Sequence, residues 1–316
     1  MNAKIVGGRL SRFWLLGFFG VAIANFVGIT GHVSAAPDWQ TSLSKETPGS
    51  FPPLRPLHAS YVFGWSGFTA ATAEVQFSRS SSDRCQLQGS GRTVGLARAL
   101  WRYDVTYAAI ANASTLRPID ANQTDAYRSK KITTHLAFNP TGVRRARSET
   151  PAPASGQSKP KDFDFPNLFD LQTAMLYLRS QPLPDRSSYR VVVYPATNAY
   201  LATATVIGHE RTSVRGGSYN AIKLDIQLKK IGKALDLQPH RKFRRAAVWV
   251  SDDADRLLLR AEAQIFIGTV FAELRSVHFD APRSRADESP GVTDQFMGGS
   301  TRREPEVPAE SPDGGE

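Results

Sequence analysis

The acidic side chains of this sequence are its best candidates for a pair of catalytic residues. Two carboxylates facing one cleft are the chemistry of a glycosidase, where one acts as acid and the other as base or nucleophile. The candidates are Asp252, Asp253, Asp255, Glu262 and Glu273. The aspartates form a polar segment between two apolar runs, and Asp is typical of such turns because it hydrogen-bonds nearby backbone groups. We therefore expect these acids to be structural and assign no catalytic residue.

Histidine and glycine patterns indicate no further active site. The histidines are His32, His58, His135, His209, His240 and His278. None has a second His, Cys or acid at the spacing with which a helix presents metal ligands, and the neighbours His209 and Glu210 point to opposite faces of a strand. The segments Gly89-Ser90-Gly91 and Gly216-Gly217-Ser218 are typical of turns, not of a nucleophile elbow or phosphate loop. We predict no metal, no cofactor and no enzymatic activity.

Aromatic side chains on predicted strands suggest a binding site instead. Those expected to contact a ligand are Tyr61, Phe63, Trp65, Trp101, Tyr103, Tyr107, Trp249 and Phe266. A curved antiparallel sheet that one helix covers only in part leaves an apolar hollow, and small-ligand sites in β domains arise in this way. The alternative for each ring is that it fills the core between sheet and helix.

Basic residues would line the rim of this hollow. The candidates are Arg98, Arg102, Arg128, Lys130, Lys131, Lys229, Lys230, Arg241 and Lys242. An apolar hollow with a cationic rim suits an amphiphile with an acidic head, such as a lipid or lipopolysaccharide, or an acidic envelope glycan. The alternative is that each charge belongs to a solvated face.

A run of alternating apolar and polar residues late in the chain predicts one of the strands that must position these side chains. Leu259, Ala261 and Ala263 fall on one face, while Glu262 falls on the other. A period of two is typical of a strand, and the phase changes at Gly268, which indicates a bulge, a bend or a tight turn. Further strands are predicted over residues 59–65, 71–77, 84–89, 101–107, 124–128, 132–138, 189–194, 201–207, 221–228 and 246–250.

One helix is predicted after residue 167. Apolar residues recur at helical spacing at Leu168, Leu171, Met175 and Leu178. Asn167 would cap this helix with Asp170 as its capping-box partner, and Pro182 would end it. Residues 94–100 form one helical turn or a loop, and residues 144–165 are predicted to be a mobile loop. The fold class is mainly β: one large curved antiparallel sheet, half-barrel-like or an open barrel, with a single main helix packed on it.

Composition divides the chain into four segments. Residues 1–35 place Lys4, Arg9 and Arg12 before an apolar run and a small-residue pattern ending at Ala35, which is typical of a secretory signal peptide. Residues 36–56 contain five prolines and are a linker, residues 57–280 are the β domain, and residues 281–316 are a disordered acidic tail. We expect a periplasmic location and no stable transmembrane span after cleavage. The alternative is that the apolar run is kept as an anchor.

The charge of the chain is strongly basic. Its formal net charge is +10, and residues 36–280 hold 32 Lys and Arg against 21 Asp and Glu. In an exported protein this balance favours acidic envelope partners and not nucleic acid, and the alternative is that it only maintains solubility. The single Cys85 excludes an intramolecular disulfide, so an exported domain would depend on its core alone.

Several short segments follow one another in a characteristic order and spacing: Tyr61 to Trp65 with Gly67, Ala71 to Phe77, the run DLQTAMLYLR from Asp170, VWVSD from Val248, and GTVFAEL from Gly268. In this order they resemble a bacterial family known as domain of unknown function 3108. The resemblance covers most of residues 59–279 and implies an exported envelope protein dominated by antiparallel β structure. It implies no established activity and no catalytic residue. Leu258 stands near where the family tends to have proline, and the insertion at 144–161 is particular to this chain.

These observations predict a non-enzymatic domain of the cell envelope that binds a lipid-like or amphiphilic component. A second hypothesis is a scaffolding module for envelope assembly, which would contact a protein partner through a sheet edge and the basic loop at 144–161. The third is a glycan hydrolase, which needs two acids facing one cleft.

Overall fold

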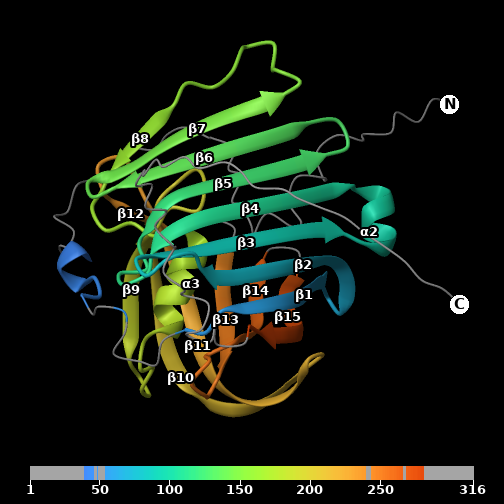
Figure 1. Ribbon diagram of the computed structural model, residues 1–316, viewed down its shortest axis with the longest axis vertical. Coiled ribbons are helices and arrows are strands. Elements are labelled where there is room, and N and C mark those ends of the chain that lie inside the picture. Colours follow the sequence, from blue (N-terminus) through green and yellow to red (C-terminus); the bar gives the residue numbers. More distant parts are fainter. Residues whose placement is uncertain (1–38, 46–47, 49–53, 240–242, 266–267, 281–316) are drawn as a thin grey trace, which may run out of the picture. The chain divides into compact units, whose positions relative to one another are not determined.

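A single antiparallel sheet dominates the computed structural model, which describes residues 39–45, 48, 54–239, 243–265 and 268–280 (Figure 1). The first eight strands are β1 Leu57–Trp65, β2 Phe68–Arg79, β3 Arg84–Thr93, β4 Tyr103–Asn112, β5 Pro118–Tyr127, β6 Lys131–Asn139, β7 Gly142–Thr150 and β8 Lys161–Asp164. The later strands are β9 Ser188–Val193, β10 Tyr200–Val214, β11 Gly217–Ile231, β12 Leu237–Pro239, β13 Phe243–Ser251, β14 Leu258–Ile265 and β15 Gly268–Phe279. The helices are η1 Trp39–Ser42, α2 Gly95–Leu100 and α3 Leu171–Arg179.

Hairpins between consecutive strands build most of this sheet. Its order is β8-β7-β6-β5-β4-β3-β2-β1-β15-β14-β13-β11-β10-β9, with β12 paired to β11 outside the path. One non-local pair joins the two halves, because β1 pairs with β15 and Leu57 lies opposite Phe279. The predicted phase change at Gly268 falls at the start of β15, where Gly268 has φ +124° and pairs with Ile265 at the end of β14.

One continuous core fills the concave side of the sheet, and α3 contributes to it (Figure 1). Leu87 and Leu136 come from the first half of the sheet, Ile222 and Leu259 from the second, and Leu176 from α3. Burial of each such side chain stabilises the fold by roughly 1.5–3 kcal/mol. Within the described residues the end strands β8 and β9 share no ladder, so the sheet is an open barrel. This confirms the predicted fold class.

The cap of α3 differs from the prediction. The Asp170 carboxylate accepts hydrogen bonds from the backbone nitrogens of Gln172 at 2.7 Å and Thr173 at 2.9 Å, and Thr173 Oγ1 accepts one from the Asp170 nitrogen at 3.1 Å. These reciprocal bonds form a capping box. The prediction of Asn167 as the cap is wrong, because this residue lies three positions earlier with φ +60°.

Two segments predicted to be irregular are strands. Residues 144–150 belong to β7 and residues 161–164 form β8, so the predicted loop over 144–165 is wrong for these parts. The sequence of β7 does not alternate between apolar and polar residues as a half-buried strand usually does, because charged residues such as Arg145 point toward the concave side. The predicted turn at Gly89-Ser90-Gly91 is also wrong, since it lies inside β3 opposite Val105 to Tyr107 of β4. The helical turn over residues 94–100 is confirmed as α2.

Part of the predicted linker packs on the domain. Trp39 stacks on Phe165 with ring centroids 5.5 Å apart, and its Nε1 donates to the Leu235 carbonyl oxygen at 2.9 Å. Ser44 exchanges hydrogen bonds of 2.9 Å with the backbone of Arg190 in β9. These contacts attach residues 39–44 to the sheet. The predicted signal peptide and acidic tail lie outside the described residues.

Candidate functional site

A pocket of about 710 Å³ lies where the two ends of the sheet approach each other. Its walls come from β7, the connection to β8, β8 itself, the β9–β10 turn and the end of β11. We call it the seam pocket. Phe163 of β8 and Tyr194, which follows β9, stack with ring centroids 5.7 Å apart at this place. The two end strands therefore meet through side chains, and the pocket occupies the gap in the barrel.

Cations outnumber acids around the seam pocket. The cations are Arg145, Arg147, Lys161, Lys230 and Lys233, and the acids are Glu149 and Asp162. Glu149 already has cationic partners, because Lys130 Nζ lies 2.5 Å from its Oε1 and Arg147 Nη2 lies 3.8 Å from its Oε2. The pocket therefore carries a positive potential that attracts anions.

Arg145 is the cation most withdrawn from solvent. Its residue is 8% exposed, and its Nη1 lies 3.5 Å from the Ala196 carbonyl oxygen. Its Nε is buried without a hydrogen-bond partner. Among the described residues no carboxylate forms an ion pair with Arg145. A buried guanidinium with one long bond to a neutral carbonyl is energetically unfavourable unless a further partner binds it.

Aromatic rings form the apolar wall of the seam pocket. Phe163 stacks on Phe165 as well as on Tyr194, with 6.3 Å between the first two centroids. The Tyr194 hydroxyl donates to the Thr197 carbonyl oxygen at 3.4 Å. Burial raises the pKa of Tyr194, and the positive charge of Arg145 opposes this shift. Tyr194 therefore stays neutral and presents its ring beside the guanidinium.

The aromatic residues expected to bind a ligand do not come together in one hollow. Tyr61, Phe63 and Trp249 are buried in the main core, with Tyr107 packed against it. Trp65 packs on a small separate cluster with Ala246, Ala263 and Val270. Trp101 and Tyr103 stack on each other with centroids 5.2 Å apart. Phe266 lies outside the described residues, and none of the other seven lines the seam pocket. Their role in ligand binding stays a prediction.

Several of these rings also make polar contacts of their own, among them Tyr103, whose hydroxyl donates to Asp125 Oδ1 at 2.5 Å. The Tyr61 hydroxyl donates to the Leu258 carbonyl oxygen at 3.0 Å, and Trp249 Nε1 donates to Glu210 at 2.5 Å. Burial raises the pKa of Tyr61 to about 12. These bonds fix the rings within the core.

The acids considered for a glycosidase are engaged elsewhere. Asp253 Oδ1 accepts hydrogen bonds from Ser251 Oγ and from the backbone nitrogens of residues 255 and 256, as expected in a hairpin turn. Glu262 pairs with Arg260, and Glu273 accepts a bond from the Arg215 backbone nitrogen at 2.6 Å. None of these acids lines the seam pocket.

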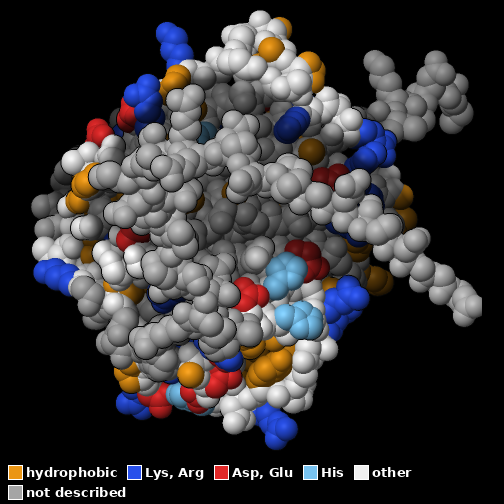
Figure 2. Space-filling view, viewed as in Figure 1, with side chains coloured by type: hydrophobic (Ala, Val, Ile, Leu, Met, Phe, Trp, Pro, Cys, Tyr) orange, Lys and Arg blue, Asp and Glu red, His pale blue; other side chains and the backbone are white. Residues whose placement is uncertain are grey.

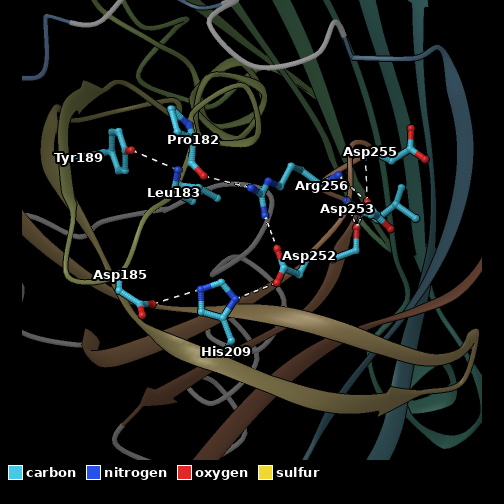
Figure 3. A network of polar contacts seen from close by, with 11 residues as sticks. Pro182, Leu183, Asp185, Tyr189, His209, Asp252, Asp253, Asp255 and Arg256 are labelled. Atoms are coloured by element: carbon cyan, nitrogen blue, oxygen red, sulfur yellow. Dashed lines mark hydrogen bonds and ion pairs between the residues drawn. The ribbon is translucent and has the colours of Figure 1, made fainter.

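A polar network missed by the sequence analysis joins three segments (Figure 3). His209 Nε2 lies 3.1 Å from Asp185 Oδ1, and its Nδ1 lies 2.8 Å from Asp252 Oδ2. Arg256 Nη1 lies 3.0 Å from Asp252 Oδ1, while its Nη2 donates to the Pro182 carbonyl oxygen. The described part of the chain holds no cluster of three or more His, Cys, Asp or Glu suited to a metal ion. We interpret the network as a structural tie.

Of the members of the predicted cationic rim that the structure describes, one lies at the seam pocket. Lys230 lines it, whereas Arg98 of α2 pairs with Asp104 of β4 at 2.9 Å, and Arg128 donates to the Ala99 carbonyl oxygen of α2. The positions 241 and 242 lie outside the described residues. Sequence reasoning missed Arg145 because it lay in the predicted loop, although its alternation with Val143 could have indicated a strand.

Comparisons with known proteins bear on the fold and the family. The structure is similar to a beta-barrel-like protein of the domain of unknown function 1849 from Brucella abortus, with 10% identity, a TM-score of 0.48 and coverage of 72% of this chain and 99% of that chain. It is also similar to a protein with a YmcC-like fold from Bacteroides fragilis, with 6% identity, a TM-score of 0.32 and coverage of 72% and 98%. No curated protein matches the chain.

The described part of the chain contains no helix with the length and apolar character that a membrane crossing requires. The family model described as "Protein of unknown function (DUF3108)" matches residues 60–275, which span the sheet from β1 to β15. The matched residues include all the segments quoted from the sequence. The chain therefore belongs to the family of domain of unknown function 3108.

Proposed function

We propose that this chain is an exported, non-enzymatic envelope protein whose seam pocket binds an amphiphile through an acidic group. Arg145 carries the proposal, because it is buried, lines the pocket and has no anionic partner among the described residues. A guanidinium forms paired, charge-assisted hydrogen bonds with carboxylate or phosphate groups. A ligand with such a group would satisfy the nitrogen that the protein leaves unpaired.

The other walls favour an amphiphile over a small inorganic anion. Phe163, Tyr194 and Ile231 supply apolar surface beside the cations. The volume of about 710 Å³ lies within the range of roughly 300–1,000 Å³ found for small-molecule sites, and it exceeds what one phosphate needs. An acidic head at Arg145 with an apolar chain along these rings would use both parts of the pocket.

The envelope part of the proposal is supported by the sequence. Residues 1–35 have the basic start, apolar run and small-residue ending of a secretory signal peptide. The excess of Lys and Arg over residues 36–280 favours acidic partners, which envelope lipids and lipopolysaccharide supply. The periplasm is the compartment in which such a domain would meet them.

A calorimetric titration with lysophosphatidylglycerol tests the proposal, with lysophosphatidylcholine of the same acyl chain as the zwitterionic control. We expect the protein to bind the acidic lipid more tightly. Arg145→Met should weaken that binding by at least about tenfold, because a charge-assisted hydrogen bond contributes about 1.5–3 kcal/mol. Arg144→Met is the matched control, since Arg144 is exposed on the other face of β7 and its loss should leave binding unchanged.

Stability without ligand separates a binding role of Arg145 from a structural one. If the guanidinium is an uncompensated buried charge, Arg145→Met should keep or raise the melting temperature. Equal binding of both lipids, or an Arg145→Met protein that melts lower and still binds the acidic lipid as the wild type does, would contradict the proposal.

Strand addition by a protein partner receives less support from the structure. The outer side of β9 already bonds to other parts of the chain, because Ser44 contacts Arg190 and the Phe169 backbone bonds to Val192 and Tyr194. An added strand would have to displace these contacts. The other end strand of the sheet is β8. The hypothesis that a partner protein adds a strand stays a prediction, and it would apply to the outer edge of β8.

A further inference from the structure

The most exposed large apolar side chains of the described residues gather at one end of the sheet. Phe68 is 75% exposed, and Leu96 and Leu100 are each 76% exposed. Phe68 begins β2 after the β1–β2 turn, and the two leucines belong to α2, which connects β3 to β4. Figure 1 shows α2 and the β1–β2 turn at the same end of the strands.

The backbone holds these elements together. The Val94 nitrogen, at the start of α2, donates to the Ala70 carbonyl oxygen of β2 at 2.9 Å, which continues the pairing of Thr93 with Ala71. Leu96 and Leu100 are four positions apart, so they lie on one face of α2. We call Phe68, Leu96 and Leu100 the apolar rim.

Cations flank the apolar rim. Arg128 donates from Nη2 to the Ala99 carbonyl oxygen at 3.1 Å, so the β5–β6 turn touches α2. Arg128 of this turn and Lys131, the first residue of β6, are exposed, and the Arg102 side chain next to α2 is 63% exposed. Figure 2 shows orange and blue side chains together at the right-hand margin, where Figure 1 places α2.

We propose that the apolar rim and its flanking arginines and lysine rest on the surface of an anionic lipid bilayer. Exposed leucine and phenylalanine beside basic residues are the composition of segments that lie in the membrane interface, where apolar groups enter the acyl boundary and cations meet acidic head groups. Large apolar side chains that are exposed together mark a surface that contacts a membrane or a partner, and the flanking cations favour an anionic membrane. This inference rests on residues outside the seam pocket and is independent of its ligand.

Trp101 is a further residue of a type that is common at membrane surfaces. It follows α2 directly and is half-buried, because it stacks on Tyr103 with centroids 5.2 Å apart. Tryptophan is enriched at the water–lipid boundary, where its ring is apolar and its nitrogen can reach water. Arg102 then follows, and its largely exposed side chain forms a long ion pair with Asp104, 3.8 Å from Nε to Oδ2.

Co-sedimentation with vesicles tests this inference. The full mature chain is mixed with vesicles of phosphatidylcholine alone, or of phosphatidylcholine with phosphatidylglycerol. We expect binding to the anionic vesicles that weakens with added salt. Leu96→Ser combined with Leu100→Ser should lower the vesicle affinity by roughly tenfold or more. Ile207→Ser is the control, since Ile207 is 49% exposed on β10 and should bind as the wild type does.

Other occupants of the apolar rim would give different results. A dimer in sedimentation equilibrium that the double Leu→Ser variant abolishes, without binding to anionic vesicles, would overturn the inference in favour of a second copy. Equal vesicle binding by the wild type and the double variant would overturn it as well. Arg144→Met, which lies outside both the seam pocket and the apolar rim, should bind the anionic vesicles normally. The double Leu→Ser variant should still bind monomeric lysophosphatidylglycerol as the wild type does, so failure of the pocket proposal can be told apart from failure of this one.

Discussion

Arg179, in the last turn of α3, donates from Nε to the carbonyl oxygen of Arg256 at 2.7 Å. Its Nη2 donates to the carbonyl oxygen of Asp255 at 2.8 Å. The side chain is buried, and burial lowers its pKa while Tyr61 and the acids of the β13–β14 turn oppose this shift. One guanidinium therefore fastens the helix to a hairpin more than seventy residues away.

Replacing Arg179 should destabilise the fold more than any exposed arginine does. Arg179→Met leaves two carbonyl oxygens without their donor, which we expect to lower the free energy of unfolding by about 2–4 kcal/mol. Chemical denaturation measures this value. Arg190→Met, on the exposed side of β9, should change it by less than about 0.5 kcal/mol, and equal losses in the two variants would contradict the assignment.

Asp170 should give the protein an unusual dependence on pH. Burial raises the pKa of this carboxyl above its ordinary value of 3.8, against the opposing effect of its bonds to Thr173 and Gln172. A raised native pKa means that the folded protein holds the proton more tightly than the unfolded chain. Its stabilising contribution is therefore fully present below the unfolded pKa and is lost as the pH rises through the native pKa.

The Asp170→Asn variant isolates this effect, because Asn still caps a helix but does not titrate. The free energy of unfolding of the wild type minus that of the variant should fall as the pH rises from about 3.8 through the native pKa. A difference that rises with pH would show that the native pKa is lowered instead. Asp170→Ala should cost about 1 kcal/mol or more at every pH through loss of the cap.

Gly142 should be intolerant of any side chain because β8 lies against it. A Cβ at this position would meet the Phe163 carbonyl oxygen at 2.4 Å and the Asp164 Cα at 3.1 Å, and both are backbone atoms. We expect Gly142→Ala to separate β8 from β7 and to weaken lysophosphatidylglycerol binding, since β8 carries Lys161 and Phe163. Ala146→Ser on β7 is the control, and a Gly142→Ala protein with wild-type binding would contradict this role of β8.

The strand content and fold class could be predicted because most strands alternate apolar and polar residues. Ala71 to Phe77 and Leu259 to Ala263 show this pattern, and both lie in strands with one buried face. The pair of β1 with β15 could not be predicted from spacing, since Leu57 and Phe279 are far apart in sequence. The resemblance to the family indicated the β structure without indicating which strands are neighbours.

The candidate site could not be predicted because its signals are non-local. The inward residues of β7 after Val143 are charged, so Arg145 looked like part of a polar loop. Its surroundings come from β8, the β9–β10 turn and β11, which only the closing of the sheet brings together. The partners of His209 are likewise distant, with Asp252 lying 43 positions away. The strands that carry Tyr61, Tyr103 and Trp249 were predicted correctly, and packing buries these rings. The predicted strand start at Trp101 is wrong, because this residue is the C-cap of α2 and β4 begins at Tyr103.

The central claim is that the seam pocket holds an acidic amphiphile at Arg145. Native mass spectrometry of the mature protein, recovered from the cells that make it, tests this claim most directly. We predict a bound species with the mass of an acidic lipid or related amphiphile on the wild type and on Arg144→Met, and its loss from Arg145→Met. A wild-type protein that carries no such species, or an Arg145→Met protein that carries it equally, would contradict the account.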